Sequence, residues 1–417
     1  MDTDTEEKLL AQSLLIASAK HDINAVRNLL KSTSAKVQDA ETGYTPLHAA
    51  VASCDPKAND RIAGALDKPT EEDKVVEIVK ILLENGAIWN DLDQNNETPG
   101  CIAFRVGLKN VYELIVAAGV RAELLLDKLQ GLQATDDDED DDEDMDEAED
   151  VEGDQTVPAS TTVNGDEKTT QKEIDAHSGA PLPTNGDEKS NEPPEDYIDH
   201  WDSNNDFLRS SLVFTDTQLL DSSSNAVMMD WETEIMARHA TTLIPKPGLR
   251  AMNVGHGMGI VDTEIQKHNP AEHHIIEAHP AVIKSMREKG WFDKPGVHIH
   301  QGRWQDVVPK LIEQGVVLDA VYYDTFAEDY SALRDFFNEA VISLMDSKGL
   351  FGFYHGLGAD RQVCYDVYTK VVELDLMDAG LETEWEEIPV PTIVWEGVRR
   401  SYWNVDIYRL PVCKFVG

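Results

Sequence analysis

The feature that most constrains this chain is the stretch from Leu249 to Glu277, LRAMNVGHGMGIVDTEIQKHNPAEHHIIE. An apolar run ends at Val254, glycines follow at positions 255, 257 and 259, and a second apolar run ends in Glu277, 22 residues after the first glycine. Glycines let the backbone approach a ligand closely, and an acid ending the next strand accepts hydrogen bonds from ribose hydroxyls. The stretch therefore predicts a strand–loop–helix–strand unit that holds the adenosine part of a cofactor.

The segments around this stretch alternate between apolar runs and amphipathic periodicity. We predict strands at 249–254, 273–277, 297–300, 318–323 and 349–354, and helices at 258–268, 280–289, 305–314, 330–346 and 360–379. Two further β-rich runs lie in TIVWEGVRRSYWNVDIYRL, with a break near Tyr402–Asn404. Alternating strands and helices form a mostly parallel sheet that is covered on both faces. The fold class predicted for residues 195–417 is therefore α/β, with a seven-stranded Rossmann-like sheet.

The first 130 residues carry helical periodicity instead, beginning with apolar residues spaced by three and four over 6–30. Further on, Thr45-Pro46-Leu47-His48 resembles the start of an ankyrin repeat, and a degenerate Thr98-Pro99 follows 53 residues later. The ankyrin period is about 33 residues, so a polar insertion at 55–73 would account for the excess. Residues 1–130 are therefore predicted to be an all-α, ankyrin-like repeat domain, with a plain helical bundle as the alternative.

Charge is distributed unevenly along the chain. The formal charge of the 417 residues is −43, and residues 136–200 contribute −22 of it. From Asp136 to Asp150, 13 of 15 residues are acidic, and Pro, Ser, Thr, Asn and Gly then dominate to about Pro194. Such a segment cannot bury enough apolar surface to fold. We therefore predict an acidic disordered linker at 131–194. The remaining chain is still acidic, which argues against nucleic acid as a partner and favours a basic protein.

The sequence shows no sign of export or membrane insertion. Its four cysteines form no close pair, which argues against a disulfide framework and a zinc site, and no metal is expected. The start, MDTDTEEK, lacks a signal sequence, and no run of 18 apolar residues is present. We expect a protein of the cytoplasm and nucleus that does not bind membranes, and a monomer by default.

The glycine loop narrows the choice of cofactor. GHGMG is not the GxGxxG of nicotinamide enzymes, because its third glycine comes one position early. Taken singly, the loop is also compatible with a turn that holds no ligand, and Glu277 with a solvated acid. In their common strand–loop–helix–strand setting, the two together favour cofactor binding.

Other polar and aromatic residues follow the predicted strands. Ligands of open α/β sheets bind at the carboxyl ends of strands, which places Asp324 well for catalysis; a helix N-cap is the alternative. Trp304 and Gln305 follow the third strand and would either contact adenine or pack at a helix entrance. His279 either starts the next helix or contacts the adenosine. Glu232 lies on a predicted helix before the first strand, and considered by itself it is predicted to be a surface acid.

Five motifs occur in order, VMMDWE (227–232), NVGHGMGI (253–260), IIEAHP (275–280), GRWQDV (302–307) and YYDTF (322–326). Together they resemble guanidinoacetate methyltransferase over residues 205–410. Ankyrin-like repeats joined to such a domain resemble the fungal type IV protein arginine methyltransferases, which put one methyl group on the internal (δ) guanidino nitrogen of protein arginines. The resemblance implies a class I methyltransferase fold, S-adenosylmethionine as cofactor and a protein substrate, of which a large-subunit ribosomal protein is the known kind.

The resemblance also implies roles for individual residues. Glu232 and Asp324 would face the guanidinium. The residues implied to bind S-adenosylmethionine are Phe207, Met228, Met236, Gly255, His256, Gly257, Met258, Gly259, Ile260, Val261, Glu277, Ala278, His279, Trp304, Gln305 and Asp324. His256 departs from the small-molecule relative, which has Phe there, and its imidazole is expected to pack on the cofactor.

Two carboxylates suit the methylation of a guanidino nitrogen. Guanidinium is protonated at physiological pH, and its lone pairs are delocalised. Glu232 and Asp324 would bind it through charge-assisted hydrogen bonds, localise its charge away from the attacked nitrogen and take up the released proton.

Other functions compete with this interpretation. An enzyme acting on a small guanidino compound would have a similar catalytic domain, but no need for repeats that present a protein-binding face. An adaptor with an inactive methyltransferase-like domain is at odds with intact Glu232, Glu277 and Asp324. A nicotinamide oxidoreductase lacks its phosphate-binding spacing. The two-glutamate and Thr-His-Trp loops of enzymes that methylate terminal guanidino nitrogens are not found.

Overall fold

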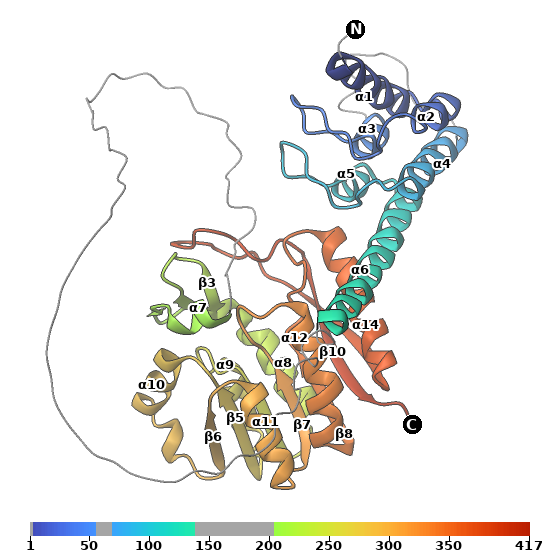
Figure 1. The fold of residues 1–417 in the computed structure, drawn as a ribbon. Coiled ribbons are helices and arrows are strands. Elements are labelled where there is room, and N and C mark those ends of the chain that lie inside the picture. Colours follow the sequence, from blue (N-terminus) through green and yellow to red (C-terminus); the bar gives the residue numbers. More distant parts are fainter. Residues whose placement is uncertain (1–2, 56–68, 138–203) are drawn as a thin grey trace, which may run out of the picture. The chain divides into compact units, whose positions relative to one another are not determined.

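The computed structural model describes residues 3–55, 69–137 and 204–417 (Figure 1). Residues 1–127 and 198–417 belong to one unit and 128–197 to another. The predicted linker at 131–194 starts within a helix that ends at Asp137, and the rest of it lies outside the described residues, as does most of the predicted insertion at 55–73. Across the described ranges, we find no helix with the length and apolar character needed to span a bilayer.

The N-terminal region is all-helical. Its helices are α1 (Thr3–Ala19), α2 (Ile23–Leu29), α3 (Pro46–Ala52), α4 (Pro69–Glu84), α5 (Pro99–Val106) and α6 (Lys109–Asp137). The two Thr-Pro steps start α3 and α5 in the same way. Thr45 and Thr98 are N-caps whose hydroxyl groups accept hydrogen bonds from backbone amides in the first turn, and proline occupies that turn.

The C-terminal region contains a seven-stranded sheet in the order β6-β5-β4-β7-β8-β10-β9. Its strands are β4 (Arg250–Val254), β5 (Glu272–Glu277), β6 (Val297–Gln301), β7 (Leu318–Tyr323), β8 (Met345–Phe353), β9 (Leu381–Pro389) and β10 (Ile407–Phe415). The first five are parallel, and β10 is antiparallel to both β8 and β9. The predicted α/β class with a mostly parallel, seven-stranded sheet is confirmed.

Helices cover both faces of this sheet. They are α8 (Thr233–Leu243), α9 (Ile260–Lys267), α10 (Pro280–Glu288), η3 (Trp291–Asp293), α11 (Trp304–Glu313), α12 (Tyr330–Asp335), η4 (Phe336–Val341), α13 (Ile342–Leu344) and α14 (Gln362–Asp378). Alternate residues of β7 pack to opposite sides, because successive side chains of a strand alternate. Val321 joins a cluster with Phe336, whereas Tyr322 joins a cluster with Met236.

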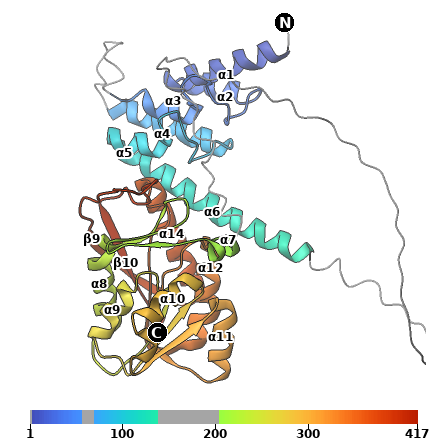
Figure 2. The same cartoon turned by 90° about the vertical axis from the view of Figure 1, so that its left-hand side faces the viewer.

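The helical region shares a core with α14. The cluster that contains Ile102 of α5 also contains Val363 and Val367 of α14. A Cβ on Gly100 would lie 2.5 Å from a methyl carbon of Val363, so this glycine permits close packing. Figures 1 and 2 both show α6 running beside α14, and Tyr112 of α6 donates to an Asp366 carboxylate oxygen at 2.5 Å.

Two predicted element boundaries were wrong at the C-terminal end. The helix predicted at 330–346 is three helical pieces that end at Leu344, and β8 begins at once. The β-rich run at 392–401 is an irregular part of the 390–406 segment, and the strand lies earlier, at β9. β9 reads LETEWEEIP and forms one edge of the sheet. Charged residues suit an exposed edge because they discourage pairing with a further strand. The same residues break the apolar pattern of a strand, so the sequence did not predict β9.

The segment before the large sheet forms a small sheet of its own. It contains α7 (Asn204–Arg209), β1 (Val213–Phe214), β2 (Gln218–Leu220), β3 (Ala226–Met229) and η2 (Asp230–Glu232). The helix that we predicted around Glu232 does not extend back to Met228 and Met229, which lie in β3. Glu232 is buried in η2, at the entrance to α8, which rules out the surface acid.

Candidate active site

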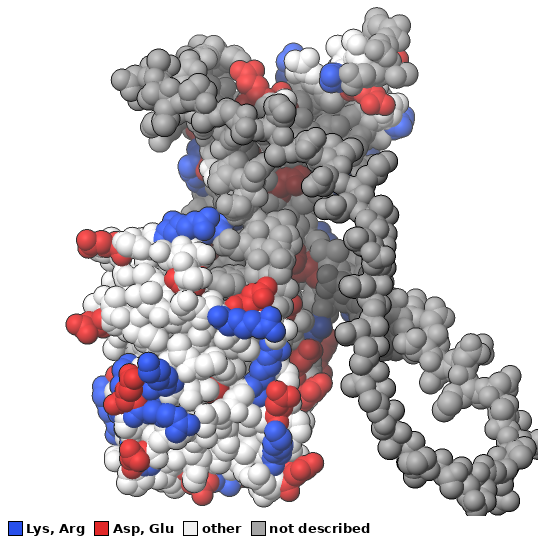
Figure 3. All heavy atoms as spheres, turned by 60° about the vertical axis from the view of Figure 1, so that its left-hand side comes forward, with Lys and Arg blue, Asp and Glu red and all other residues white. Residues whose placement is uncertain are grey.

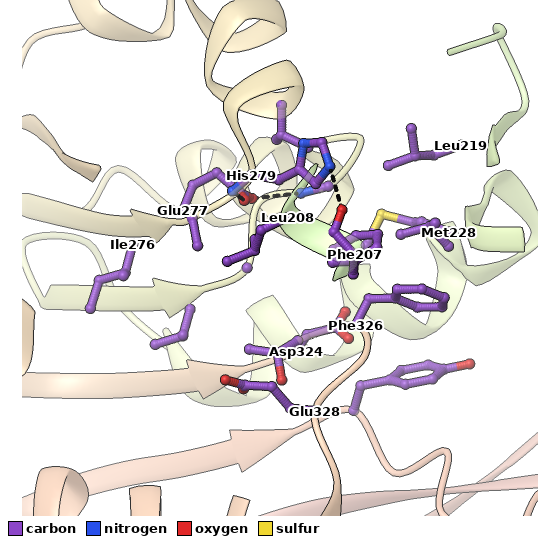
Figure 4. A pocket seen from close by; sticks show the side chains of 18 of the residues that line it. Phe207, Leu208, Leu219, Met228, Ile276, Glu277, His279, Asp324, Phe326 and Glu328 are labelled. Atoms are coloured by element: carbon purple, nitrogen blue, oxygen red, sulfur yellow. Dashed lines mark hydrogen bonds between the residues drawn. The ribbon is translucent and has the colours of Figure 1, made fainter. Parts of the chain in front are cut away.

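A cavity of about 250 Å³ lies at the carboxyl ends of β4, β5 and β7. β5 and β6 follow β4 on one side of it, whereas β7 starts the other half of the sheet, so the strand order reverses at this point. Open α/β sheets bind ligands at such a switch point. Figure 4 shows Glu277 and His279 on one side of the cavity and Asp324 and Glu328 on the other.

The loop after β4 depends on the backbone freedom of glycine. Gly255, Gly257 and Gly259 have φ angles of +93°, +53° and +80°. A Cβ on Gly255 would lie 1.9 Å from the carbonyl oxygen of Asp324, so two strand ends meet backbone to backbone. Gly255 and Gly257 line the cavity. The loop is thus a cradle that tolerates only glycine at position 255.

Glu277 closes this cradle from the end of β5. Its Oε2 accepts hydrogen bonds from the backbone nitrogens of His256, at 2.8 Å, and Gly257, at 3.4 Å. Its Oε1 accepts from the backbone nitrogen of His279 at 2.7 Å. A carboxylate has about four acceptor positions, so capacity remains for a hydroxyl donor in the cavity. The cradle and this acid fit a ligand with neighbouring hydroxyl groups, such as a ribose.

His256 does not line the cavity, which corrects the expectation that its imidazole packs on the cofactor. The side chain is buried, its Nδ1 lies 2.6 Å from Oδ2 of Asp262, and its ring meets the edge of Trp291. Burial alone would raise the pKa of Asp262, but the hydrogen bond with His256 helps to lower it below its usual range. The imidazole therefore supports the loop from behind, and the backbone amide serves Glu277.

His279 combines the two roles that the sequence left open. It is the N-cap of α10, because its Nδ1 accepts a hydrogen bond from Ala281, and it also lines the cavity. With Nδ1 accepting, the ring proton sits on Nε2, which donates to the carbonyl of Phe207 at 3.1 Å. Phe207 packs on this imidazole and on Phe326. Burial lowers the pKa of His279, which keeps it neutral.

Trp304 lines the cavity, whereas Gln305 is exposed and does not line it. Both side chains donate to Glu328, each at 3.3 Å. Tyr323 also donates to Glu328, at 2.5 Å. Glu328 was absent from the predicted site, although it follows the YYDTF motif by only two residues. It is a carboxylate acceptor in the wall beside Trp304.

Glu232 and Asp324 form the other end of the cavity. Asp324 caps no helix, because the N-cap of α12 is Asp329, and its Oδ2 is buried without a hydrogen-bond partner. Burial and the charge of Asp324 raise the pKa of Glu232 well above its usual range. Burial and the charge of Asp262 raise the pKa of Asp324 to about 7. Both carboxylates therefore resist ionisation and would gain from a bound cation.

The sequence interpretation missed the aromatic residues at this end. Tyr402 and Tyr354 line the cavity. The hydroxyl of Tyr402 donates to Oε1 of Glu232 and accepts from the indole nitrogen of Trp231 at 3.2 Å. Tyr402 lies in the irregular segment between β9 and β10, at the break that we predicted near Tyr402–Asn404. That break was the sequence signal available for an irregular segment at this position.

The structure thus separates the predicted residues into two groups. Those that line the cavity are Phe207, Met228, Glu232, Gly255, Gly257, Glu277, Ala278, His279, Trp304 and Asp324. Those that do not are Met236, His256, Met258, Gly259, Ile260, Val261 and Gln305. α9 begins at Ile260 and leads the chain away, while Met236 and Val261 are buried in the core. In the described part of the chain, no group of three or more His, Cys, Asp and Glu side chains is placed to hold a metal ion.

The strand order, the glycine cradle after β4 and the acid that ends β5 define a class I methyltransferase fold.

The model of the guanidinoacetate N-methyltransferase family matches residues 195–386. Curated relatives cover nearly the whole chain. Protein arginine N-methyltransferase 2 of Emericella nidulans is 46% identical over 99% of both chains, and that of Aspergillus fumigatus 48% identical over 100% of this chain and 98% of its own. That of Neurospora crassa is 43% identical over 97% of this chain and 96% of its own. The chain belongs to the fungal protein arginine N-methyltransferase 2 family.

Proposed function

We propose that this chain is an S-adenosylmethionine-dependent methyltransferase that transfers one methyl group to the δ nitrogen of arginine in a protein, a type IV activity. The observation that carries the proposal is the carboxylate pair of buried Glu232 and partly buried Asp324, which shares a cavity with Glu277 and the glycine cradle. The name of the relatives supports arginine as the acceptor. The capacity of Glu277 for hydroxyl donors supports an adenosine cofactor.

The cavity residues suit this reaction. S-adenosylmethionine, when bound, supplies an electrophilic methyl group, and Gly255, Gly257 and Glu277 would hold its adenosine. Glu232 and Asp324 would orient the guanidinium, and orientation alone is worth up to roughly 7–11 kcal/mol. As the new C–N bond forms, the S–C bond to the transferred methyl group would break, which leaves a neutral thioether, and the attacked nitrogen would lose its proton, so the methylated product keeps a single positive charge. The carboxylate pair receives that proton.

The charges of the cavity favour an arginine side chain over a small guanidino acid. Such an acid carries a carboxylate that needs a cationic partner. Among the described residues that line the cavity, Arg303 is the one Lys or Arg, and its guanidinium donates to Asn205 at 2.6 Å. The acceptor end presents Glu232, Asp324 and Tyr402 instead. An arginine within a polypeptide brings no carboxylate of its own to this end.

We further propose that residues 1–130 are ankyrin-like and bind protein, that 131–194 are a linker and that 195–417 are the catalytic domain. Support for the repeats comes from α3 and α5, which start at Thr-Pro steps with equivalent caps. A basic substrate such as a large-subunit ribosomal protein, met in the cytoplasm or nucleus, suits the charge of −43. Residues 136–200 contribute −22 of this charge, so we assign about half of the attraction to them. On the face in Figure 3, acidic and basic side chains are interspersed.

The test is a labelling experiment with the full chain, labelled S-adenosylmethionine and a cell extract. We expect labelled protein that yields δ-monomethylarginine on hydrolysis. Glu232→Gln and Asp324→Asn should each lower labelling at least 100-fold without loss of cofactor binding, whereas Glu234→Gln, at an exposed neighbour, should not. Label confined to small molecules would favour a guanidino metabolite, and cofactor binding without transfer would favour an inactive adaptor.

A further inference from the structure

Tyr402 lies in a segment that is fixed to its surroundings. Residues 390–406 join β9 to β10 without regular structure. The side chain of Gln218 donates to the carbonyl of Glu396 at 3.0 Å, and the backbone nitrogen of Arg399 donates to the carbonyl of Ser224 at 2.9 Å. The backbone nitrogen of Asn404 donates to the carbonyl of Ala359 at 2.7 Å. The segment is therefore anchored at three points, and its Tyr402 forms part of the cavity wall.

The direction of the hydrogen bonds at Tyr402 follows from the chemistry of indole. The Trp231 nitrogen can only donate, so it donates to the Tyr402 oxygen at 3.2 Å. The Tyr402 hydroxyl proton then points to Oε1 of Glu232. Trp395 packs edge-on against the Tyr402 ring, with centroids 4.9 Å apart, and fixes its orientation. The backbone of Met229 also hydrogen-bonds the Glu232 carboxylate, and Tyr402 supplies the side-chain hydrogen bond, at Oε1.

The other ionisable groups near Glu232 give it no positive charge. Asp324 faces it from the end of β7, and Tyr354 from the end of β8. Tyr322 of β7 and Tyr408 of β10 complete the set of interacting groups. Tyrosines at these buried positions stay protonated. Among these side chains, Tyr402 donates the hydrogen bond that favours the ionised form of Glu232.

We propose that Tyr402 is a positioning residue for the acceptor. It holds Oε1 of Glu232, so that Oε2 faces the guanidinium, and it supports the ionised carboxylate that a bound cation requires. No covalent step involves Tyr402 itself. The inference rests on the proposed function only in taking the ligand of Glu232 to be a guanidinium.

The test compares Tyr402→Phe with Tyr368→Phe as matched control, because Tyr368 donates to Glu123 at 3.0 Å, away from the cavity. The probe is methylguanidine, titrated calorimetrically into the cofactor-bound chain between pH 6 and pH 9. We expect Tyr402→Phe to weaken binding about 10-fold at pH 7, as for a lost hydrogen bond to a charged group. The defect should shrink as the pH rises, because a larger fraction of Glu232 is then ionised before the ligand binds. Tyr368→Phe should bind as the parent chain does.

Steady-state kinetics of methyl transfer to the protein that becomes labelled in the cell extract provide a second measurement. Tyr402→Phe should raise the apparent KM for that protein about 10-fold while kcat changes less than about 3-fold. Trp231→Phe, which removes the donor to Tyr402, should give a smaller effect in the same direction, and it replaces the first variant if that one fails to fold.

The outcomes separate this inference from the proposed function. A defect of equal size at every pH, a loss of cofactor affinity, or a parent chain that does not bind methylguanidine would overturn the role of Tyr402. If the parent chain binds methylguanidine with the expected pH dependence but labels no protein, the positioning role stands and the proposed function fails.

Discussion

The two ends of the cavity are built in different ways. At the end near β5, Glu277 accepts hydrogen bonds from three backbone amides, and Gly255 meets the backbone of Asp324. At the other end, Glu232 depends on the side chain of Tyr402, and an oxygen of Asp324 has no partner. Backbone geometry sets the first end, whereas the second is set by titratable side chains, buried Glu232 and partly buried Asp324.

Because of this difference, the two ends of the cavity should respond to different perturbations. Backbone amides do not change charge with pH, so the Glu277 end is organised before a ligand arrives. The pKa values of Glu232 and Asp324 are raised by burial, so their end is complete only once a cation has entered. Backbone substitutions should therefore damage cofactor binding, whereas pH should act on the acceptor.

Gly255→Ala should have the largest effect. Its Cβ would clash with the Asp324 carbonyl at 1.9 Å, and its φ of +93° disfavours any side chain. We expect a loss of about 3 kcal/mol or more of unfolding free energy and at least 100-fold in cofactor affinity. Gly248→Ala is the matched control, because Gly248 has φ +82° and open space around it; it should lose about 1 kcal/mol. Denaturant unfolding and calorimetry measure both, and equal losses would refute the close approach.

Asp324→Asn should stabilise the chain while it abolishes activity. The folded pKa of about 7 lies above the ordinary 3.8, so the stability associated with the protonated form is lost as the pH rises through 7. The gain of the variant should therefore grow from pH 5 to pH 8. It should reach about 1–2 kcal/mol, less than the full linkage value because the residue is partly open to water. Urea unfolding at both pH values measures it, and a destabilised variant at pH 8 would contradict the raised pKa.

The pH dependence of kinetics should divide between the two ends. Guanidinium binding needs ionised carboxylates, so kcat/KM for the protein acceptor should rise below a midpoint at or above 7, by about 10-fold per pH unit for each carboxylate that must ionise, and then level off. Cofactor affinity should change less than about 2-fold between pH 6 and pH 9, because amides hold Glu277 and His279 stays neutral. A cofactor affinity that follows the same midpoint would show that the two ends are coupled.

Sequence patterns anticipated the backbone-built end best. A glycine run after an apolar strand and an acid 22 residues later are local in the chain, and β4, β5 and β7 lie within a residue of their predicted bounds. The cradle could be predicted because the glycines and the strand-end acid occur together in one strand–loop–helix–strand unit, although each of them alone has other uses. His256 could not, because its inward rotation depends on Asp262 and Trp291.

The acceptor end was only half predictable. Glu232 and Asp324 came from motifs that resemble a family, but Tyr402 is 170 residues from its partner. No local period joins such residues; the sheet order does, by placing β10 beside β8. The strand β9 was missed for the same reason. Its glutamates break the apolar alternation that is typical of a strand, although all of its residues pair with β10. Contacts made by side chains across distant segments are what the sequence alone does not reveal.

The smallest predicted effect separates two methionines that the family resemblance placed together over the cofactor. Met228 lines the cavity, and its sulfur accepts a hydrogen bond from the backbone nitrogen of Met258 at 3.3 Å. Met236 is fully buried behind the cavity, where its sulfur accepts from the Tyr322 hydroxyl at 3.2 Å. Leucine conserves volume but cannot accept a hydrogen bond, so each substitution should cost less than about 1.5 kcal/mol.

Met228→Leu should therefore weaken cofactor binding about 3-fold, because it removes a weak hydrogen bond that helps to hold the glycine loop, and should leave the KM for the protein acceptor unchanged. Met236→Leu should leave both constants unchanged and lower only the unfolding free energy. Calorimetry with the cofactor, steady-state kinetics and denaturant unfolding distinguish the two. If Met236→Leu weakened the cofactor as much as Met228→Leu does, the wall of the cavity would have to include α8, and the division between backbone-built and side-chain-built ends would no longer hold.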